Sequence, residues 1–168
     1  MMYRFVRRRD LPFILITIII GIFAHFMYEF SGRNPITALI APINESVWEH
    51  LKLLFFPFLL VSLAEYFLQR PAPAVFFAAR FAGVWTGMLT ITFLYYGYSG
   101  ILGKNYTPID IFLFFAGVMT AYCVSSKYSK KLHVRESLTI FLCWAFTVLM
   151  FFVFTCFPPE IPLFLPPV

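Results

Sequence analysis

The chain has 168 residues, of which 61% are hydrophobic, 21% are aromatic and only 12% are charged. Its mean hydropathy is +0.82, and so few polar side chains cannot cover the surface of a water-soluble globule of this size. The composition therefore excludes a soluble domain. It predicts a multi-pass protein of the cytoplasmic membrane, with the lipid bilayer as its first partner.

Five apolar stretches reach the length of about 20 residues that a helix needs to cross the hydrocarbon core of a membrane. They lie at residues 11–30, 47–68, 74–98, 109–126 and 134–157. Only short connections remain between them. The sequence thus predicts an all-α membrane protein in which residues 1–168 form a single domain, a bundle of five transmembrane helices.

The distribution of basic residues explains the net charge of +5 without nucleic acid as a partner. In the five-span arrangement, ten of the 13 Lys and Arg residues fall on one side of the membrane. Because such residues gather on the cytoplasmic side, we expect the N-terminus in the cytoplasm and the C-terminus outside. The ten are Arg4, Arg7, Arg8, Arg9, Arg70, Arg80, Lys127, Lys130, Lys131 and Arg135; the others are Arg33, Lys52 and Lys104.

The first span carries two ionisable residues, His25 and Glu29, near its predicted outer end. They are one helical turn apart, so their side chains share a face. Ionisable groups at membrane depth are costly and mark functional sites by default. The apolar segment 35–43 that follows is too short to cross the core, and we expect it to lie at the interface.

The second span begins with the most polar part of the chain, Asn44-Glu45-Ser46-Val47-Trp48-Glu49-His50-Leu51-Lys52. On a helix, Glu45 and Glu49 share one face, and Ser46 and His50 share another about 100° away. The S-x-x-E spacing of Ser46 and Glu49 also matches a capping box, which satisfies the free amides of a helix start. These two residues are therefore candidates both for a helix cap and for a site.

Three further features concern packing. Glu65 and Arg80 fall near the cytoplasmic ends of consecutive spans, where a buried charge needs a partner, so we expect a structural ion pair. A stripe of small residues at Ala79, Gly83 and Gly87 predicts close approach of another helix, from a neighbouring span or from a second copy of the chain. The proline-rich tail, residues 158–168, is expected to lie extended along the outer face.

The polar residues of the first two spans, together with tyrosines and Asp110 at the same level, predict an outward-facing pocket. In one interpretation the pocket binds a divalent metal such as zinc and the protein is an intramembrane hydrolase or transferase acting on a lipid or a peptide. The candidate metal ligands are His25 and His50 with Glu29, or with Glu45 or Glu49 in its place or beside it. A carboxylate that does not bind the metal would be the general base, so the candidate catalytic residues are Glu49, Glu45 and Ser46.

Two other interpretations remain open at this point. The polar cluster fits a small carrier of ions, protons or solutes, although a five-span chain without an inverted repeat would then need to act as a dimer. It also fits an accessory subunit that docks on a larger membrane partner. Metal content after purification distinguishes the first interpretation from the carrier.

Three segments carry a resemblance to a known family: His25-Phe26-x-Tyr28-Glu29, the long run from Ala41 to Leu53, and Thr155-x-x-Pro158-Pro159-x-Ile161-Pro162-x-Phe164. They resemble the hallmarks of a family of small prokaryotic multi-pass membrane proteins known only as a domain of unknown function. The resemblance spans nearly the whole chain. It implies a compact five-span protein and no particular activity.

Overall fold

The computed structural model describes residues 8–130, 132 and 137–166. Five helices in this part of the chain are long and apolar enough to cross a membrane, which confirms the predicted all-α architecture. They are α1 (Leu11–Phe30), α3 (Val47–Gln69), α4 (Pro73–Leu102), α5 (Thr107–Tyr128) and α6 (Ser137–Cys156). Two short elements complete the order: a 3₁₀ turn, η1 (Arg8–Asp10), precedes α1, and α2 (Pro35–Ile40) lies between α1 and α3.

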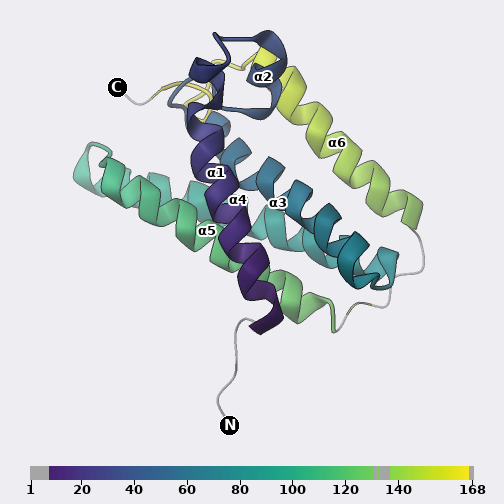
Figure 1. Ribbon diagram of the computed structural model, residues 1–168. Coiled ribbons are helices and arrows are strands. Elements are labelled where there is room, and N and C mark those ends of the chain that lie inside the picture. Colours follow the sequence, from purple (N-terminus) through teal and green to yellow (C-terminus); the bar gives the residue numbers. More distant parts are fainter. Residues whose placement is uncertain (1–7, 131, 133–136, 167–168) are drawn as a thin grey trace.

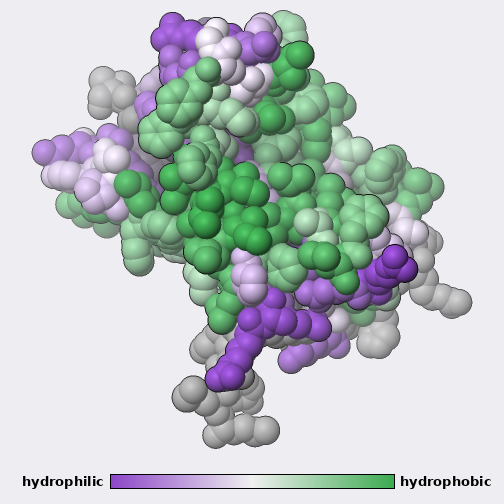
Figure 2. All heavy atoms as spheres, viewed as in Figure 1, coloured by the Kyte–Doolittle hydropathy of each residue, from purple (hydrophilic) through white to green (hydrophobic). Residues whose placement is uncertain are grey.

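The helices are arranged so that polar residues gather at two opposite ends of the molecule. In Figure 1, α1 begins at the bottom, and α2 lies at the top together with the tail that follows α6. Figure 2 shows a broad hydrophobic region between hydrophilic groups at the top and the bottom. This distribution suits a bundle whose middle faces hydrocarbon and whose two ends face water.

The helix bounds follow the predicted spans closely, with one extension. α4 continues through Gly97 and Gly100 to Leu102 and has 30 residues, which corresponds to a length of about 45 Å. A helix of that length exceeds the hydrocarbon thickness, so it must tilt or project beyond the core. Residues 134–136 of the expected fifth span and residues 167–168 of the tail lie outside the described residues.

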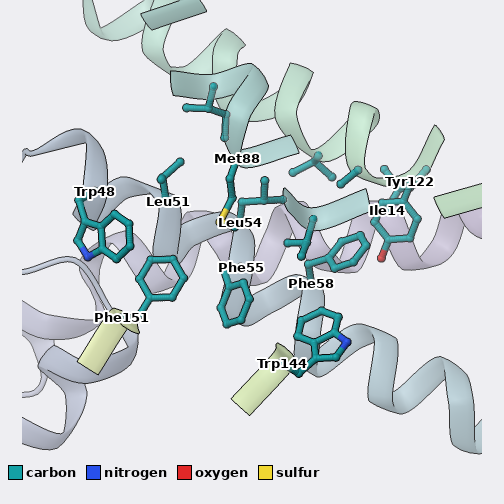
Figure 3. Close-up of a cluster of buried hydrophobic side chains, with 14 of the residues drawn as sticks. Ile14, Trp48, Leu51, Leu54, Phe55, Phe58, Met88, Tyr122, Trp144 and Phe151 are labelled. Atoms are coloured by element: carbon teal, nitrogen blue, oxygen red, sulfur yellow. The ribbon is translucent and has the colours of Figure 1, made fainter. Parts of the chain in front are cut away.

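Helix α3 occupies the centre of the bundle. Leu54, Phe55 and Phe58 on this helix are completely buried, and Figure 3 shows them among side chains from the other spans. Those partners are Ile14 of α1, Met88 of α4, Tyr122 of α5, and Trp144 and Phe151 of α6. Because every other spanning helix contributes to this cluster, the position of α3 is fixed, and so is that of the polar segment at its start.

The stripe of small residues on α4 packs against α5 and is therefore occupied within the chain. An added Cβ at Gly83 would lie 2.4 Å from the Ala121 carbonyl oxygen, and one at Gly87 would lie 2.6 Å from the Gly117 carbonyl oxygen. Ala79 on the same face is buried. The sequence leaves two partners open for this stripe, a neighbouring span or a second copy of the chain. In the structure the neighbouring span α5 packs against it.

Replacing Gly83 by alanine should destabilise the α4–α5 pair. The new methyl group meets backbone, which cannot rotate away, and overpacking of this kind typically costs about 1–3 kcal/mol. Gly97→Ala on the same helix is a matched control, because no heavy atom lies within 4 Å of its added Cβ. Thermal unfolding in detergent should show a lower midpoint for Gly83→Ala alone; equal midpoints would contradict the packing described.

The two charged residues at the lower end of α3 and α4 lie together. Arg80 donates a hydrogen bond to the carboxylate of Glu65, and both side chains are buried. The Arg80 guanidinium also lies over the rings of Phe58, Phe76 and Tyr122, at 4.7 to 5.5 Å from their centroids. The charge is therefore held by one carboxylate and three aromatic faces, an environment that suits a planar guanidinium.

The tail after α6 differs from the expected extended arrangement, because residues 158–166 form turns. Phe164 is buried, with its ring centroid 4.9 Å from that of Trp48 and 5.2 Å from that of Phe154. The Leu163 carbonyl accepts a hydrogen bond of 2.9 Å from the Trp48 amide. Proline excludes helix here, but it does not prevent turns, and the aromatic contact folds the tail back onto the start of α3.

The orientation of the bundle in the membrane remains a prediction from the basic residues. A fluorescent reporter fused into the loop at residues 127–135 should be active in the cytoplasm, and alkaline phosphatase fused after Val168 should be active outside it. Activity of the first fusion and inactivity of the second would mean that the chain crosses the membrane an even number of times.

Candidate functional site

The segment that leads into α3 is shaped by local hydrogen bonds. The Asn44 side chain accepts from the Ser46 amide at 2.9 Å, and the Ser46 hydroxyl accepts from the Glu49 amide at 3.3 Å. Ser46 is therefore the N-cap of α3, in extended backbone conformation. Glu45 stands before the cap and outside the helix, so its side chain does not follow the helical wheel on which the sequence analysis placed it.

Glu49 and Lys52 form a buried pair that holds the preceding segment in place. The Lys52 ammonium lies 2.8 Å from the Glu49 carboxylate and 2.8 Å from the Ala38 carbonyl oxygen. Glu49 also accepts from the Ile43 amide at 2.9 Å. Because the contacts with Ala38 and Ile43 link α3 to the segment before it, the pair fastens that segment to α3, and Glu49 acts here as a structural residue.

A second set of ionisable side chains, His25, Glu45 and His50, converges nearby. Each can offer one ligand atom such that all three atoms lie within 4.8 Å of one another. The two imidazole centroids are 5.4 Å apart, and His50 Nε2 lies 3.3 Å from a Glu45 carboxylate oxygen. Both histidines are half-buried and Glu45 is exposed, so the cluster sits at the edge of the protein interior.

The surroundings of His50 determine what the cluster can hold. His50 Nδ1 lies 3.0 Å from the Ser46 carbonyl oxygen, and a carbonyl only accepts, so Nδ1 carries the hydrogen. In neutral imidazole the Nε2 lone pair then points towards the Glu45 carboxylate oxygen, 3.3 Å away. Lone pairs on two atoms at this distance repel each other. A positive species between them, a proton or a metal ion, resolves this contact.

The cluster forms part of the wall of a cavity of about 400 Å³ between α1, α3, α4 and α5. Tyr95, Asn105 and Asp110 line the same cavity. Asp110 accepts hydrogen bonds from Tyr98 and, at 3.3 Å, from Asn105. Thr107 also lines the cavity, and the remaining wall is apolar: Gly21, Ile22, Phe26, Val47, Leu53, Ile91, Ile111, Leu113 and Phe114.

The structure thus brings together only some of the residues that the sequence singled out. His25, His50 and Glu45 meet, whereas Glu29 is exposed and lies 3.3 Å from Arg33 one turn further on. Ser46 is occupied as a helix cap and Glu49 as a partner of a lysine. Neither Glu29 nor Glu49 belongs to the group of possible metal ligands found among the described residues.

One residue with a clear role, Asn105, was not among those that the sequence indicated, and another, Lys52, lies in a different environment from the one expected. Asn105 lines the cavity and donates a hydrogen bond to Asp110. Its position five residues before Asp110, across the start of a helix, is the sequence feature that could have indicated this contact. The i,i+3 spacing of Glu49 and Lys52 predicts a solvated ion pair. The structure contains this pair, but both side chains are buried.

Comparison with known proteins gives one match. No curated protein and no solved structure was found to match the chain. A family model described as a family of unknown function, DUF6512, matches residues 6–168. This confirms the resemblance to an uncharacterised family that the sequence motifs indicate. Because the match extends over nearly the entire chain, the protein belongs to the DUF6512 family.

Proposed function

We propose that the protein is a membrane enzyme in which His25, Glu45 and His50 bind a divalent metal ion such as zinc. The observation that carries the proposal is the convergence of three ligand atoms within 4.8 Å on the wall of a cavity. Two imidazoles and one carboxylate are a ligand set of catalytic zinc sites, which keep a fourth position open for water or substrate.

The distance between His50 and Glu45 fits a metal of this size. Two ligands of a tetrahedral zinc ion, each bonded at about 2.0–2.1 Å, lie about 3.3 Å from each other. His50 Nε2 and the Glu45 oxygen are 3.3 Å apart. The hydrogen bond from His50 Nδ1 to the Ser46 carbonyl is the kind of second interaction that orients a metal-bound histidine and fixes its tautomer.

The chemistry that follows is hydrolysis or group transfer. A metal in this position would lower the pKa of a bound water molecule and polarise a carbonyl or phosphoryl oxygen of the substrate. His25, Glu45 and His50 would hold the ion. Water would replace the leaving group of the substrate, and the proton that the water loses would go to that leaving group. Glu49, a candidate base in the sequence analysis, is not proposed for this role, because it is buried against Lys52 and Ile43.

The test is the metal content of the purified protein. Full-length protein in detergent, loaded with zinc and dialysed, should retain about one zinc ion per chain by elemental mass spectrometry. His25→Ala, His50→Ala and Glu45→Ala should each lose it. Glu29→Gln is the matched control, since this carboxylate is exposed and paired with Arg33, and it should retain the metal. Ser46→Ala should retain it too, while losing about 1 kcal/mol of stability.

Two results would contradict the proposal. One is a folded wild-type protein that retains no divalent metal under any loading condition; that outcome would favour the carrier of ions or solutes over the enzyme. The other is zinc that remains in His25→Ala and His50→Ala at the wild-type level, because the metal would then be bound elsewhere on the chain.

A further inference from the structure

The cavity opens towards the region that lipid occupies. Three of its lining residues, Ile22 and Phe26 of α1 and Ile111 of α5, are also exposed, by 45%, 49% and 52%. Both helices are membrane spans, so exposed apolar side chains along them face hydrocarbon. The mouth between α1 and α5 is therefore a lateral opening through which a bilayer component can reach the cavity.

The inner part of the cavity is built to receive hydrocarbon. Leu53, Ile91, Leu113 and Phe114 line it. Phe114 packs directly against Gly21. A Cβ added at Gly21 would lie 2.6 Å from Phe114 Cζ and 2.7 Å from the Leu53 carbonyl oxygen. The absence of a side chain at Gly21 thus lets the Phe114 ring pack directly against α1. The side chains of these residues carry no polar group.

The polar part of the wall accepts hydrogen bonds and carries negative charge. Asp110, which is not one of the proposed metal ligands, supplies a carboxylate, and Asn105 donates a hydrogen bond to it; Tyr95 and Thr107 line the same cavity. Among the described residues that line the cavity, none is Lys or Arg. A ligand head that carries ammonium or hydroxyl donors complements such a wall, whereas a purely anionic head does not.

We infer that the occupant is a membrane lipid that enters sideways between α1 and α5. Its hydrocarbon chain lies against Leu53, Leu113 and Phe114, and its donor-bearing head group lies between the His25–Glu45–His50 cluster and Asp110. A cavity of about 400 Å³ is in the size range of ligand sites, and the remainder of the lipid stays in the bilayer. The inference rests on the proposed function only for what then happens to the bound lipid.

The probe is a phosphatidylethanolamine with a photoactivatable diazirine in one acyl chain, added to zinc-loaded protein in nanodiscs. After illumination, mass spectrometry should find labels concentrated on the cavity-lining stretches of α1, α3 and α5. Ile111→Trp, which narrows the mouth, should reduce this labelling about tenfold, the effect of a loss of about 1.4 kcal/mol in binding. Phe112→Trp is the matched control, because Phe112 is exposed on the same helix and does not line the cavity.

The head-group requirement has its own comparison. Phosphatidylcholine with the same diazirine chain has the same net charge but no N–H donors. It should label the cavity about tenfold less, because it cannot donate a hydrogen bond to a carboxylate. Asp110→Asn should remove the preference for phosphatidylethanolamine. Ile22→Trp, on the opposite side of the mouth, replaces Ile111→Trp if that variant does not fold.

The outcomes separate this inference from the proposed function, because zinc is measured in every sample. Labels spread evenly over the outer faces of all helices, or labelling unchanged in both mouth variants, would overturn the lipid site even where zinc remains bound. Concentrated labelling in a protein that binds no zinc would support the lipid site and contradict the metal enzyme.

Discussion

Lys52→Met is expected to lower the free energy of unfolding by about 3–5 kcal/mol, because the carboxylate of Glu49 would stay buried without its cation. Lys52 is completely buried, and its ammonium contacts Glu49 and the Ala38 carbonyl oxygen. Methionine nearly fills the same volume, so the loss reports on charge more than on packing. Denaturation in detergent measures the change, and Lys104→Met, at a lysine exposed over the Tyr106 ring, should change stability little.

The same substitution should also have a local effect on the segment before α3. Hydrogen exchange of peptides covering residues 35–46 should accelerate, because the Ala38 carbonyl and the Ile43 amide are tied to α3 through Lys52 and Glu49. Glu49→Gln combined with Lys52→Met should recover only part of the stability, since the Ala38 carbonyl remains without its donor. Exchange that is unchanged in this segment would show that the pair does not hold it.

Arg80→Met is expected to be as damaging at the other end of the bundle. It leaves Glu65 buried without a partner, which typically costs about 3–5 kcal/mol. Glu65→Gln alone should also destabilise, and the double variant should be more stable than the sum of the two losses predicts. Thermal unfolding of the four proteins in detergent completes the cycle. Strictly additive losses would mean that the two side chains do not interact.

Two companion variants sharpen that cycle. Arg80→Lys keeps the positive charge but loses the planar group that lies over three aromatic rings, so it should fall between wild type and Arg80→Met. Glu29→Gln removes an exposed carboxylate that is also paired with an arginine. Exposed pairs contribute little, and this variant should unfold close to wild type.

Much of the fold follows from the sequence because a membrane imposes strong rules. Each span must be apolar and about 20 residues long, and the five stretches in this chain satisfy that rule without ambiguity. Glu65 and Arg80 could be paired because a charge at such depth has few possible partners. The tail could not be predicted in the same way, since the contact of Phe164 with Trp48 joins residues far apart in sequence.

The candidate site was predicted in part, and the errors have identifiable causes. His25 and His50 meet because they lie at the same depth on adjacent helices. Glu29 was assigned to them by its spacing of four residues from His25, but Arg33 stands at the same spacing on its other side and carries the opposite charge.

Glu45 illustrates a second cause. Helical periodicity predicts that it shares a helix face with Glu49, whereas α3 begins only after the N-cap Ser46, so Glu45 lies outside the helix. Its direction therefore depends on the backbone of the turn before the cap, which helical periodicity does not describe. That turn brings the carboxylate back to His50. Helix boundaries, which sequence patterns locate poorly, thus decided which carboxylate joined the histidines.

The contact between the tail and the start of α3 has a consequence for how the protein is made. The Leu163 carbonyl accepts a hydrogen bond from the Trp48 amide, and the Phe164 ring packs against the Trp48 ring. Trp48 precedes His50 of the candidate site by two residues. Helices emerge from the ribosome in order, so α1 and α3 are inserted long before residues 158–166 exist. The start of α3, which bears the candidate site, therefore lacks these contacts at first. Its packing is complete only after α6 has crossed the membrane and the tail has reached the same side.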